Sequence, residues 1–143
     1  MYGTEEAVGK GIRNSGVPRE EIFLTTKLWN NVHDPKDVEK ALDNSLKLLN
    51  VDYVDLYHMH WPSPFKSGPE AFPRDPNGDG QKTLIGDTDF VETYKAMEKL
   101  LQTGKVKALG VSNFSKSELQ RLLDNTTVVS CHTLNQAYNV NNI

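Results

Sequence analysis

The sequence predicts an α/β fold, a partial (β/α)8 TIM barrel with about four parallel strands and intervening helices. Short runs rich in β-branched and aromatic residues alternate with longer amphipathic runs, which is the pattern of parallel βαβ units. The short runs are almost continuously apolar, as in strands buried on both faces. No glycine fingerprint of the G-x-G-x-x-G type follows a strand, so a doubly wound dinucleotide-binding sheet is not supported.

The length of the chain limits how much of a barrel it can form. A complete barrel needs roughly 250 residues, and the chain has 143. We therefore expect residues 1–143 to form one partial domain that lacks the N-terminal and C-terminal parts of the barrel.

The first elements follow from local pattern. The chain opens on a helical pattern over residues 4–16, which is followed by a β-rich run over residues 21–30. A second helical pattern covers residues 35–50. Asp34 is its predicted N-cap, because Pro35 would then occupy the first helical position, where proline is favoured. The apolar residues that recur at helical spacing in this pattern are Val38, Leu42, Leu46 and Leu49.

The middle of the chain contains a long segment without periodicity. Residues 53–60, YVDLYHMH, are the second predicted strand, and residues 89–102 are the next predicted helix, which Gly104 ends. Between them, residues 62–88 hold five of the seven prolines and four of the ten glycines. An inter-domain linker is one interpretation. Because only one short βα block precedes the segment, we favour a loop on the active-site face of a barrel.

Three further elements complete the predicted alternation. Residues 105–114, KVKALGVSNF, are the third strand, and residues 115–125 are the helix that follows it. Residues 126–136 form a weaker fourth strand.

Composition argues against several classes of protein. The formal net charge is −3 with a pI of about 5.8, and no block of lysine and arginine stands out, so no nucleic-acid partner is expected. No apolar run is long enough to span a bilayer, and the N-terminus lacks the apolar core of a signal peptide. Cys131 is the only cysteine, which precludes an intrachain disulfide and fits a cytoplasmic protein.

Polar side chains follow the predicted strands at the point where each strand ends. The carboxyl ends of barrel strands hold the active site in this architecture, so these residues are candidates for a functional site. Tyr2 precedes the first helix, where a preceding strand would end. The strand-end residues are Lys27, His58, His60, Ser112, Asn113, Asn135 and Gln136.

Each candidate also has a purely structural interpretation. Lys27 could be a surface lysine at a strand end, and the two tryptophans near the strand ends could be packing residues. The sole role of Ser112 and Asn113 could be to cap the helix that begins near Ser115.

The H-x-H pair at the end of the second strand has three interpretations. His58 and His60 share one face, because side chains alternate along a strand. Such a pair can bind zinc, as in a metal-binding barrel hydrolase. That interpretation needs further ligands, and only His132 and distant carboxylates are available. Alternatively, His58 is a core residue and His60 is the functional one, or both fill the core.

Four separated motifs together resemble one family. YGTEEAVGKGI, TTKLWN, DLYHMHWP and GKVKALGVSNF are similar in order and spacing to the aldo-keto reductases, over residues 2 to about 125. Residues 62–88 and 89–123 most resemble the fungal aldehyde reductases and glycerol dehydrogenases that use NADP. The resemblance implies an NADP-dependent oxidoreductase domain that exchanges a hydride with a small carbonyl or polyol substrate. It also implies a full-length form that is a monomer.

The resemblance implies roles for individual residues. The family's catalytic tyrosine, lysine and histidine match Tyr2, Lys27 and His60, while its catalytic aspartate would precede Met1. A lysine ammonium beside a phenol favours the phenolate and lowers the pKa of the phenol, and a histidine can orient the carbonyl group. No metal is required. The implied cofactor-binding residues are Ser112, Asn113 and Gln136, and the implied substrate-binding residues are Trp29, Trp61 and His60.

The chain departs from the family pattern at two places. Position 58 is more often apolar in the family, and Ala137 and Tyr138 follow the N-Q motif where a glutamate is usual. Two alternatives to a reductase stay open. One is a non-catalytic fragment that acts through exposed sheet edges, and the other is the metal-binding H-x-H barrel.

Overall fold

The computed structural model describes residues 3–78, 82–128 and 133–134. Within them, helices and strands alternate along the chain, as predicted. The elements are α1 (Glu5–Ser15), β1 (Thr25–Leu28), α2 (Val38–Leu49), β2 (Val54–Met59), α3 (Phe90–Leu100), β3 (Val106–Ser112), α4 (Lys116–Asn125) and β4 (Thr133–Leu134). Short 3-10 helices occur at η1 (Arg19–Glu21), η2 (Asn30–Val32) and η3 (Leu101–Thr103).

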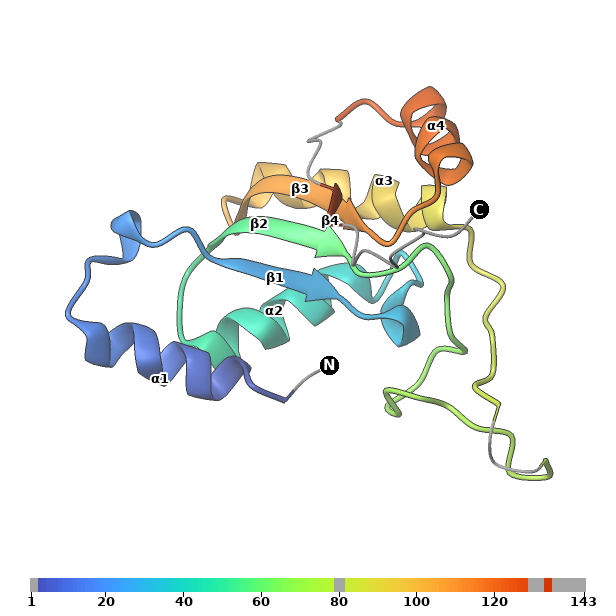
Figure 1. Cartoon of the computed structure of the whole chain (residues 1–143), viewed down its shortest axis with the longest axis horizontal. Helices are drawn as coiled ribbons and strands as arrows, with labels where there is room; N and C mark the ends of the chain where they lie inside the picture. The colour runs from blue at the N-terminus through green and yellow to red at the C-terminus, as the bar shows by residue number, and fades with distance from the viewer. Residues whose placement is uncertain (1–2, 79–81, 129–132, 135–143) are drawn as a thin grey trace, which may run out of the picture.

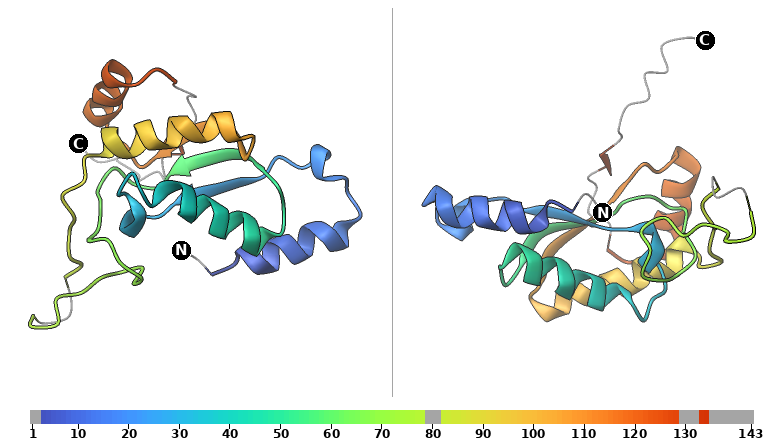
Figure 2. Two further views of the ribbon diagram at one scale, coloured as in Figure 1. Left: turned by 180° about the vertical axis from the view of Figure 1, so that it is seen from behind. Right: turned by 90° about the horizontal axis from the view of Figure 1, so that it is seen from below.

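The four strands form one parallel sheet in the order β1-β2-β3-β4 (Figure 1). Helices α2 and α3 cover one face of this sheet, while α1 lies beside the β1 edge (Figure 2). Because every strand runs in the same direction, the carboxyl ends of all strands lie at one edge. The segment 62–88 leaves the sheet at that edge, as expected of an active-site loop (Figure 1).

The two faces of the sheet carry different side chains. Leu28 and Met59 are paired in register, as are Met59 and Val111, and these buried side chains enter the core beneath α2 and α3. Lys27 and His58 are also paired in register. They point to the opposite face, because side chains alternate along a strand. The face that carries Lys27 and His58 is therefore the one that faces inward in a barrel.

The prediction that Asp34 caps the second helix is wrong. Helix α2 begins at Val38, three residues later than its predicted first residue. The Asp34 carboxylate instead accepts a hydrogen bond from the backbone N–H of Lys36 at 3.2 Å, and the Asp34 carbonyl accepts from the N–H of Asp37 at 2.8 Å. These bonds form a turn, so the helical ladder starts only with the bond from the Ala41 N–H to the Asp37 carbonyl.

Two other predicted boundaries also shift. The β-rich run 21–30 forms a strand only over β1, because η1 precedes it and η2 begins at Asn30. The predicted fourth strand, residues 126–136, is described as a strand only at β4, and much of the run lies outside the described residues. Gly104 ends the segment after α3 in a left-handed conformation, with φ of 75°, as predicted.

A cluster of charges joins the amino ends of the strands. Asp55 is buried, and its carboxylate accepts hydrogen bonds from Arg19 and from the Leu24 N–H at 2.9 Å each and from Lys107 at 3.0 Å. Arg19 and Lys107 also both lie 4.1 Å from the centre of the Tyr53 ring. Burial alone would raise the pKa of Asp55, but the hydrogen bonds outweigh burial and lower it. The cluster therefore fixes the end of the sheet opposite the candidate site.

Within the described part of the chain, none of the helices combines the length and the apolar character that crossing a membrane requires.

Helix α1 packs against the carboxyl end of α2 at Gly9. A Cβ atom added at Gly9 would lie only 2.1 Å from the carbonyl oxygen of Leu49. The guanidinium of Arg13 reaches the same carbonyl at 3.5 Å. Only glycine permits so close an approach between the two backbones.

We expect Gly9→Ala to lower the free energy of unfolding by about 1–3 kcal/mol, because the added methyl group forces α1 away from α2. Gly11→Ala is the matched control, since a Cβ at Gly11 in the same helix meets nothing within 4 Å. That replacement should instead stabilise the protein by up to about 1 kcal/mol. Urea unfolding measures both effects. Equal unfolding midpoints for the two variants would contradict the close packing at Gly9.

Candidate active site

The ends of β1, β2 and β3 bring the described candidates together. Lys27 is on β1, His60 follows β2 directly, and Ser112 is the last residue of β3. A cavity of about 680 Å³ opens beside these ends and is lined by Lys27, Trp29 and His60. It also extends between β1 and helices α1 and α2. Lys27, His60 and Ser112 therefore lie at the same edge of the sheet, and their functional roles stay predictions.

His60 is held in a buried and neutral state. Its side chain is largely enclosed, and its ring meets the ring of Trp29 edge-on, with 4.9 Å between the centroids. Its backbone N–H donates to the Leu28 carbonyl at 3.1 Å, which continues the ladder between β1 and β2. Burial, and then the positive charge of Lys27, lower the pKa of His60 to about 4. A neutral imidazole carries one N–H donor, which can bind a carbonyl oxygen.

Asn113 connects the ends of β2 and β3. It adopts a left-handed backbone conformation with φ of 62°. Its side-chain Nδ2 donates to the His60 carbonyl at 2.8 Å and to the Ser112 hydroxyl at 2.9 Å. Both donors of the amide are therefore engaged, and the amide carbonyl is the group that it offers to a ligand.

The interpretation of Ser112 and Asn113 as helix caps is wrong. The N-cap of α4 is Ser115, whose hydroxyl accepts from the Glu118 N–H at 3.3 Å. The Glu118 carboxylate accepts from the Ser115 N–H at 2.8 Å, which completes a capping box. Since Ser115 supplies the cap, Ser112 and Asn113 are not the capping residues of α4.

Aromatic side chains form a second cavity next to the first. It measures about 320 Å³ and is lined almost entirely by apolar atoms. The ring of Trp29 lies 5.8 Å from that of Phe65 and 5.4 Å from that of Phe72. Phe65 and Phe72 were not predicted, although two phenylalanines in a loop after the strand-end tryptophans were a usable signal. The cavity is lined by Trp29, Asn30, Trp61, Ser63, Phe65 and Phe72.

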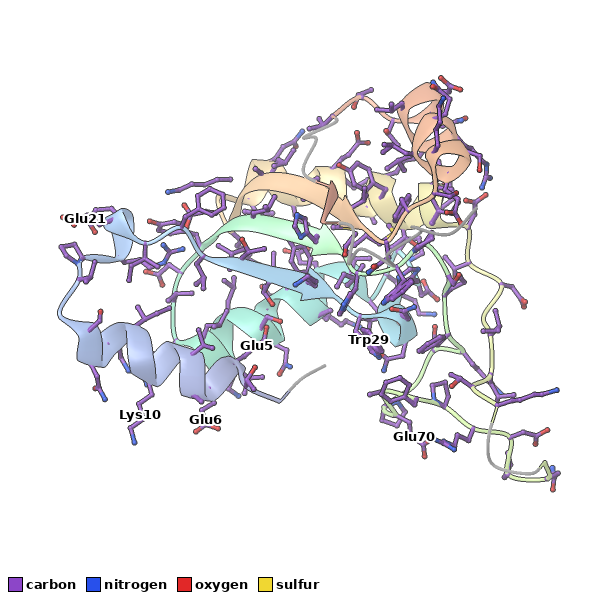
Figure 3. The ribbon with its side chains drawn as sticks, viewed as in Figure 1. Glu5, Glu6, Lys10, Glu21, Trp29 and Glu70 are labelled. Carbon is purple, nitrogen blue, oxygen red and sulfur yellow. The ribbon has the colours of Figure 1, made fainter. Side chains whose placement is uncertain are left out.

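The segment that follows β1 holds the loop 62–88 in place. Trp29, which Figure 3 shows just beyond β1, donates from its indole nitrogen to the Ala71 carbonyl at 2.7 Å. Asn30 donates to the Ser63 carbonyl at 2.7 Å. Asn31 donates to the carbonyls of Gly68 and Glu70 at 2.8 and 3.0 Å. These bonds fix the loop against the strand ends, which argues against an inter-domain linker.

The other histidine of the H-x-H pair lies inside the protein. His58 is fully buried on β2. No group of three or more histidine, cysteine, aspartate or glutamate side chains that could hold a metal occurs among the described residues. His58 is therefore best interpreted as a core residue. Three further candidates, Tyr2, Asn135 and Gln136, lie outside the described residues.

The chain is similar in sequence to known proteins over most of its length. The family model described as "Aldo/keto reductase family" matches residues 1–141, which includes the segment after residue 130. The NAD(P)H-dependent D-xylose reductase of Candida tenuis is 48% identical over 136 residues, which cover 89% of the chain and 42% of that protein. The D/L-glyceraldehyde reductase of Hypocrea jecorina is 43% identical over 134 residues, covering 90% of the chain and 40% of that protein.

The fold is also that of solved structures. An aldose reductase from Schistosoma japonicum superposes with a TM-score of 0.86 and 38% identity, covering 92% of the chain and 44% of that structure. The prediction of a partial (β/α)8 barrel is thereby confirmed. The chain spans about two fifths of the length of the curated relatives that it matches.

A second histidine with a lowered pKa lies away from the cavity. His33 is buried, and neither of its ring nitrogens has a hydrogen-bond partner among the residues that the structure describes. Burial lowers its pKa to about 4. Its carbonyl accepts a hydrogen bond from the Thr93 hydroxyl on α3 at 2.7 Å. His33 therefore belongs to the core rather than to the site.

We expect the free energy of unfolding to fall as the pH is lowered from about 6.5 to about 4. The unfolded chain binds a proton at His33 and at His60 near the ordinary pKa of 6.5, while the folded protein binds it only near pH 4. For His33 alone this shift corresponds to about 3 kcal/mol. Urea unfolding at pH 7 and at pH 4.5 measures the effect. A His33→Phe variant should lose less stability, and an unchanged pH dependence would contradict the assignment.

Proposed function

The chain belongs to the aldo/keto reductase family, and we propose that it forms the central part of an enzyme that reduces aldehydes or ketones to alcohols with NADPH. Residues 1–143 contribute the tyrosine, lysine and histidine of the catalytic group in this proposal. The remaining strands of the barrel come from sequence outside these residues. We also propose that the full-length protein is a monomer. Because the single cysteine of the chain precludes an intrachain disulfide, we place the reaction in the cytosol.

The observation that carries the proposal is the state of His60. A neutral imidazole lies at the base of a cavity, against Trp29 and near the positive charge of Lys27. Its N–H can bind the oxygen of a substrate carbonyl in a site with little water, where one hydrogen bond is worth more than in solution. A protonated histidine would be repelled by Lys27, so the lowered pKa suits this role.

In the proposed reaction, a carbonyl group receives a hydride at its carbon and a proton at its oxygen. A nicotinamide cofactor, when bound beside Ser112 and Asn113, would supply the hydride for the carbonyl carbon and would itself be oxidised. The C=O π electrons move to the oxygen, and the Tyr2 hydroxyl gives its proton to that oxygen. The resulting Tyr2 phenolate is stabilised by the Lys27 ammonium. His60 holds the oxygen in line throughout this step.

Residues at the end of β3 suit the carboxamide of a nicotinamide ring. Ser112 and Asn113 lie at the strand end next to His60, and the carbonyl oxygen of the Asn113 amide can accept an N–H from a carboxamide. We propose that Gln136 contributes to the same contact. We further propose NADP rather than NAD, although the relative from Candida tenuis is named as NAD(P)H-dependent.

The second cavity suits a small organic substrate. Trp29 and Trp61 line it together with Phe65 and Phe72, and His60 reaches Trp29 from the first cavity. The relative from Hypocrea jecorina is named as a glyceraldehyde reductase. We therefore propose glyceraldehyde as a substrate and glycerol oxidation as the reverse reaction. A non-catalytic fragment that acts through its sheet edges would show no such turnover.

We expect Tyr2→Phe in the full-length protein to lower kcat for NADPH oxidation with glyceraldehyde by about 10²–10⁴-fold, because general acid catalysis contributes this much. Tyr53→Phe is a suitable control, since it removes a phenol hydroxyl at the amino end of the sheet and should leave kcat near its normal value. A near-normal kcat for Tyr2→Phe would mean that Tyr2 is not the proton donor.

We also expect the purified full-length protein to contain no stoichiometric zinc, because the reaction relies on His60 as a hydrogen-bond donor rather than as a ligand. Elemental analysis measures the zinc content directly. A content of about one zinc per chain that disappears in a His60→Ala variant would favour the metal-binding H-x-H barrel over the reductase.

A further inference from the structure

A hydrogen bond connects the start of α1 to β1 on the face of the sheet away from Lys27. The hydroxyl of Thr26 donates to the carboxylate of Glu5 at 2.6 Å, across 21 residues of sequence. Glu5 is the first residue of α1 and is partly buried, whereas Glu6 beside it is exposed. Figure 3 shows Glu5 directed toward the sheet and Glu6 directed away from it. The pair is therefore a specific contact, not a chance meeting of surface side chains.

The surroundings of this pair leave the contact partly buried, and both residues line the cavity of about 680 Å³. Tyr57 is fully buried and is paired in register with Thr26, so both side chains lie on the same face of the sheet. Burial raises the pKa of the Tyr57 hydroxyl, and the negative charge of Glu5 raises it further. Hydrogen bonds to a carboxylate are stronger than those between neutral groups, and more so in such surroundings.

The start of α1 is otherwise weakly fixed. Its N-cap residue, Thr4, makes no side-chain capping bond. Gly3, just before it, has a positive φ of 64°, a conformation that glycine adopts without strain. The body of α1 packs on α2 through Gly9. Glu5 is thus the residue that ties the first turn of α1 to β1 among the described contacts.

The two partners adjoin two residues of the proposed reaction. Glu5 follows Tyr2 by three residues, and Thr26 directly precedes Lys27 in β1. We propose that Glu5 is a positioning residue, which through Thr26 fixes the start of α1, three residues after Tyr2 in the sequence, against the strand of Lys27. This inference rests on the proposed function, because it assigns a geometry to the residues that transfer the proton. Neither Glu5 nor Thr26 touches the substrate in this proposal.

The expected consequence of losing the bond is a defect in the chemical step. A displacement of about 1 Å between reacting groups can cost about a hundredfold in rate. We therefore expect Thr26→Val and Glu5→Ala to lower kcat by about tenfold to a hundredfold in the full-length enzyme. KM for NADPH and for glyceraldehyde should change by less than about threefold, because an interaction that acts on the transition state alone lowers kcat without weakening substrate binding.

The test is a double-mutant cycle with a rescue and a matched control. If the two side chains act as one unit, the Glu5→Ala/Thr26→Val double variant should be no slower than either single variant. Thr26→Ser keeps the hydroxyl and should restore most of the rate. Glu6→Ala is the control, because Glu6 is the other acidic residue in the first turn of α1 and has the same favourable interaction with the helix dipole.

Each result decides the proposal. An unchanged kcat in Glu5→Ala, an equal loss in Glu6→Ala, a multiplied loss in the double variant or no rescue by Thr26→Ser would overturn it. If Thr26→Val does not fold, as judged by circular dichroism, Glu5→Ala against Glu6→Ala decides alone. The two proposals also fail separately. A normal kcat for Tyr2→Phe removes the proposed function, whereas an inactive Tyr2→Phe with a fully active Glu5→Ala removes only the positioning role.

Discussion

Parallel pairing of β1, β2 and β3 in a single register is the constraint on which the candidate site depends. It aligns the carboxyl ends of the three strands at one edge, so that Lys27, His60 and Ser112 become neighbours although they are distant in sequence. A slip of one residue would turn these side chains toward α2 and α3, because the period of a strand is two. The packing of Leu28 and Met59 in the core opposes that slip. The burial of apolar side chains on one face of the sheet therefore fixes the positions of the candidate side chains on the other face.

The segment after β1 performs two tasks with adjacent residues. The ring of Trp29 packs on His60 and lines both cavities, while its indole N–H and the amides of Asn30 and Asn31 hold the loop 62–88. The loop has isolated antiparallel bridges of its own, between Phe65 and Ile85 and between Arg74 and Thr83. Anchoring it to a strand end couples the shape of the aromatic cavity to the sheet, so the loop and the polar residues form one site.

The sequence was sufficient for the order of elements and for part of the site. Hydrophobic periodicity separated strands from helices, and the residues that follow the strands identified Lys27 and His60. The role of Asp34 was misjudged because a carboxylate can close a turn as readily as it can cap a helix. Phe65 and Phe72 were missed, since a loop has no period from which the direction of a side chain can be inferred. Their positions depend on contacts across the fold.

The charge cluster at Asp55 and the candidate site lie at opposite ends of the sheet. Asp55, Arg19 and Lys107 join the amino ends of the strands, whereas the candidate catalytic side chains occupy the carboxyl ends. Changes at the candidate site therefore fall on one end of the sheet, and the interactions of this charge cluster fall on the other. Such a division lets specificity diverge in evolution while the scaffold is retained, and it gives protein engineers a region that can be varied with little penalty in folding.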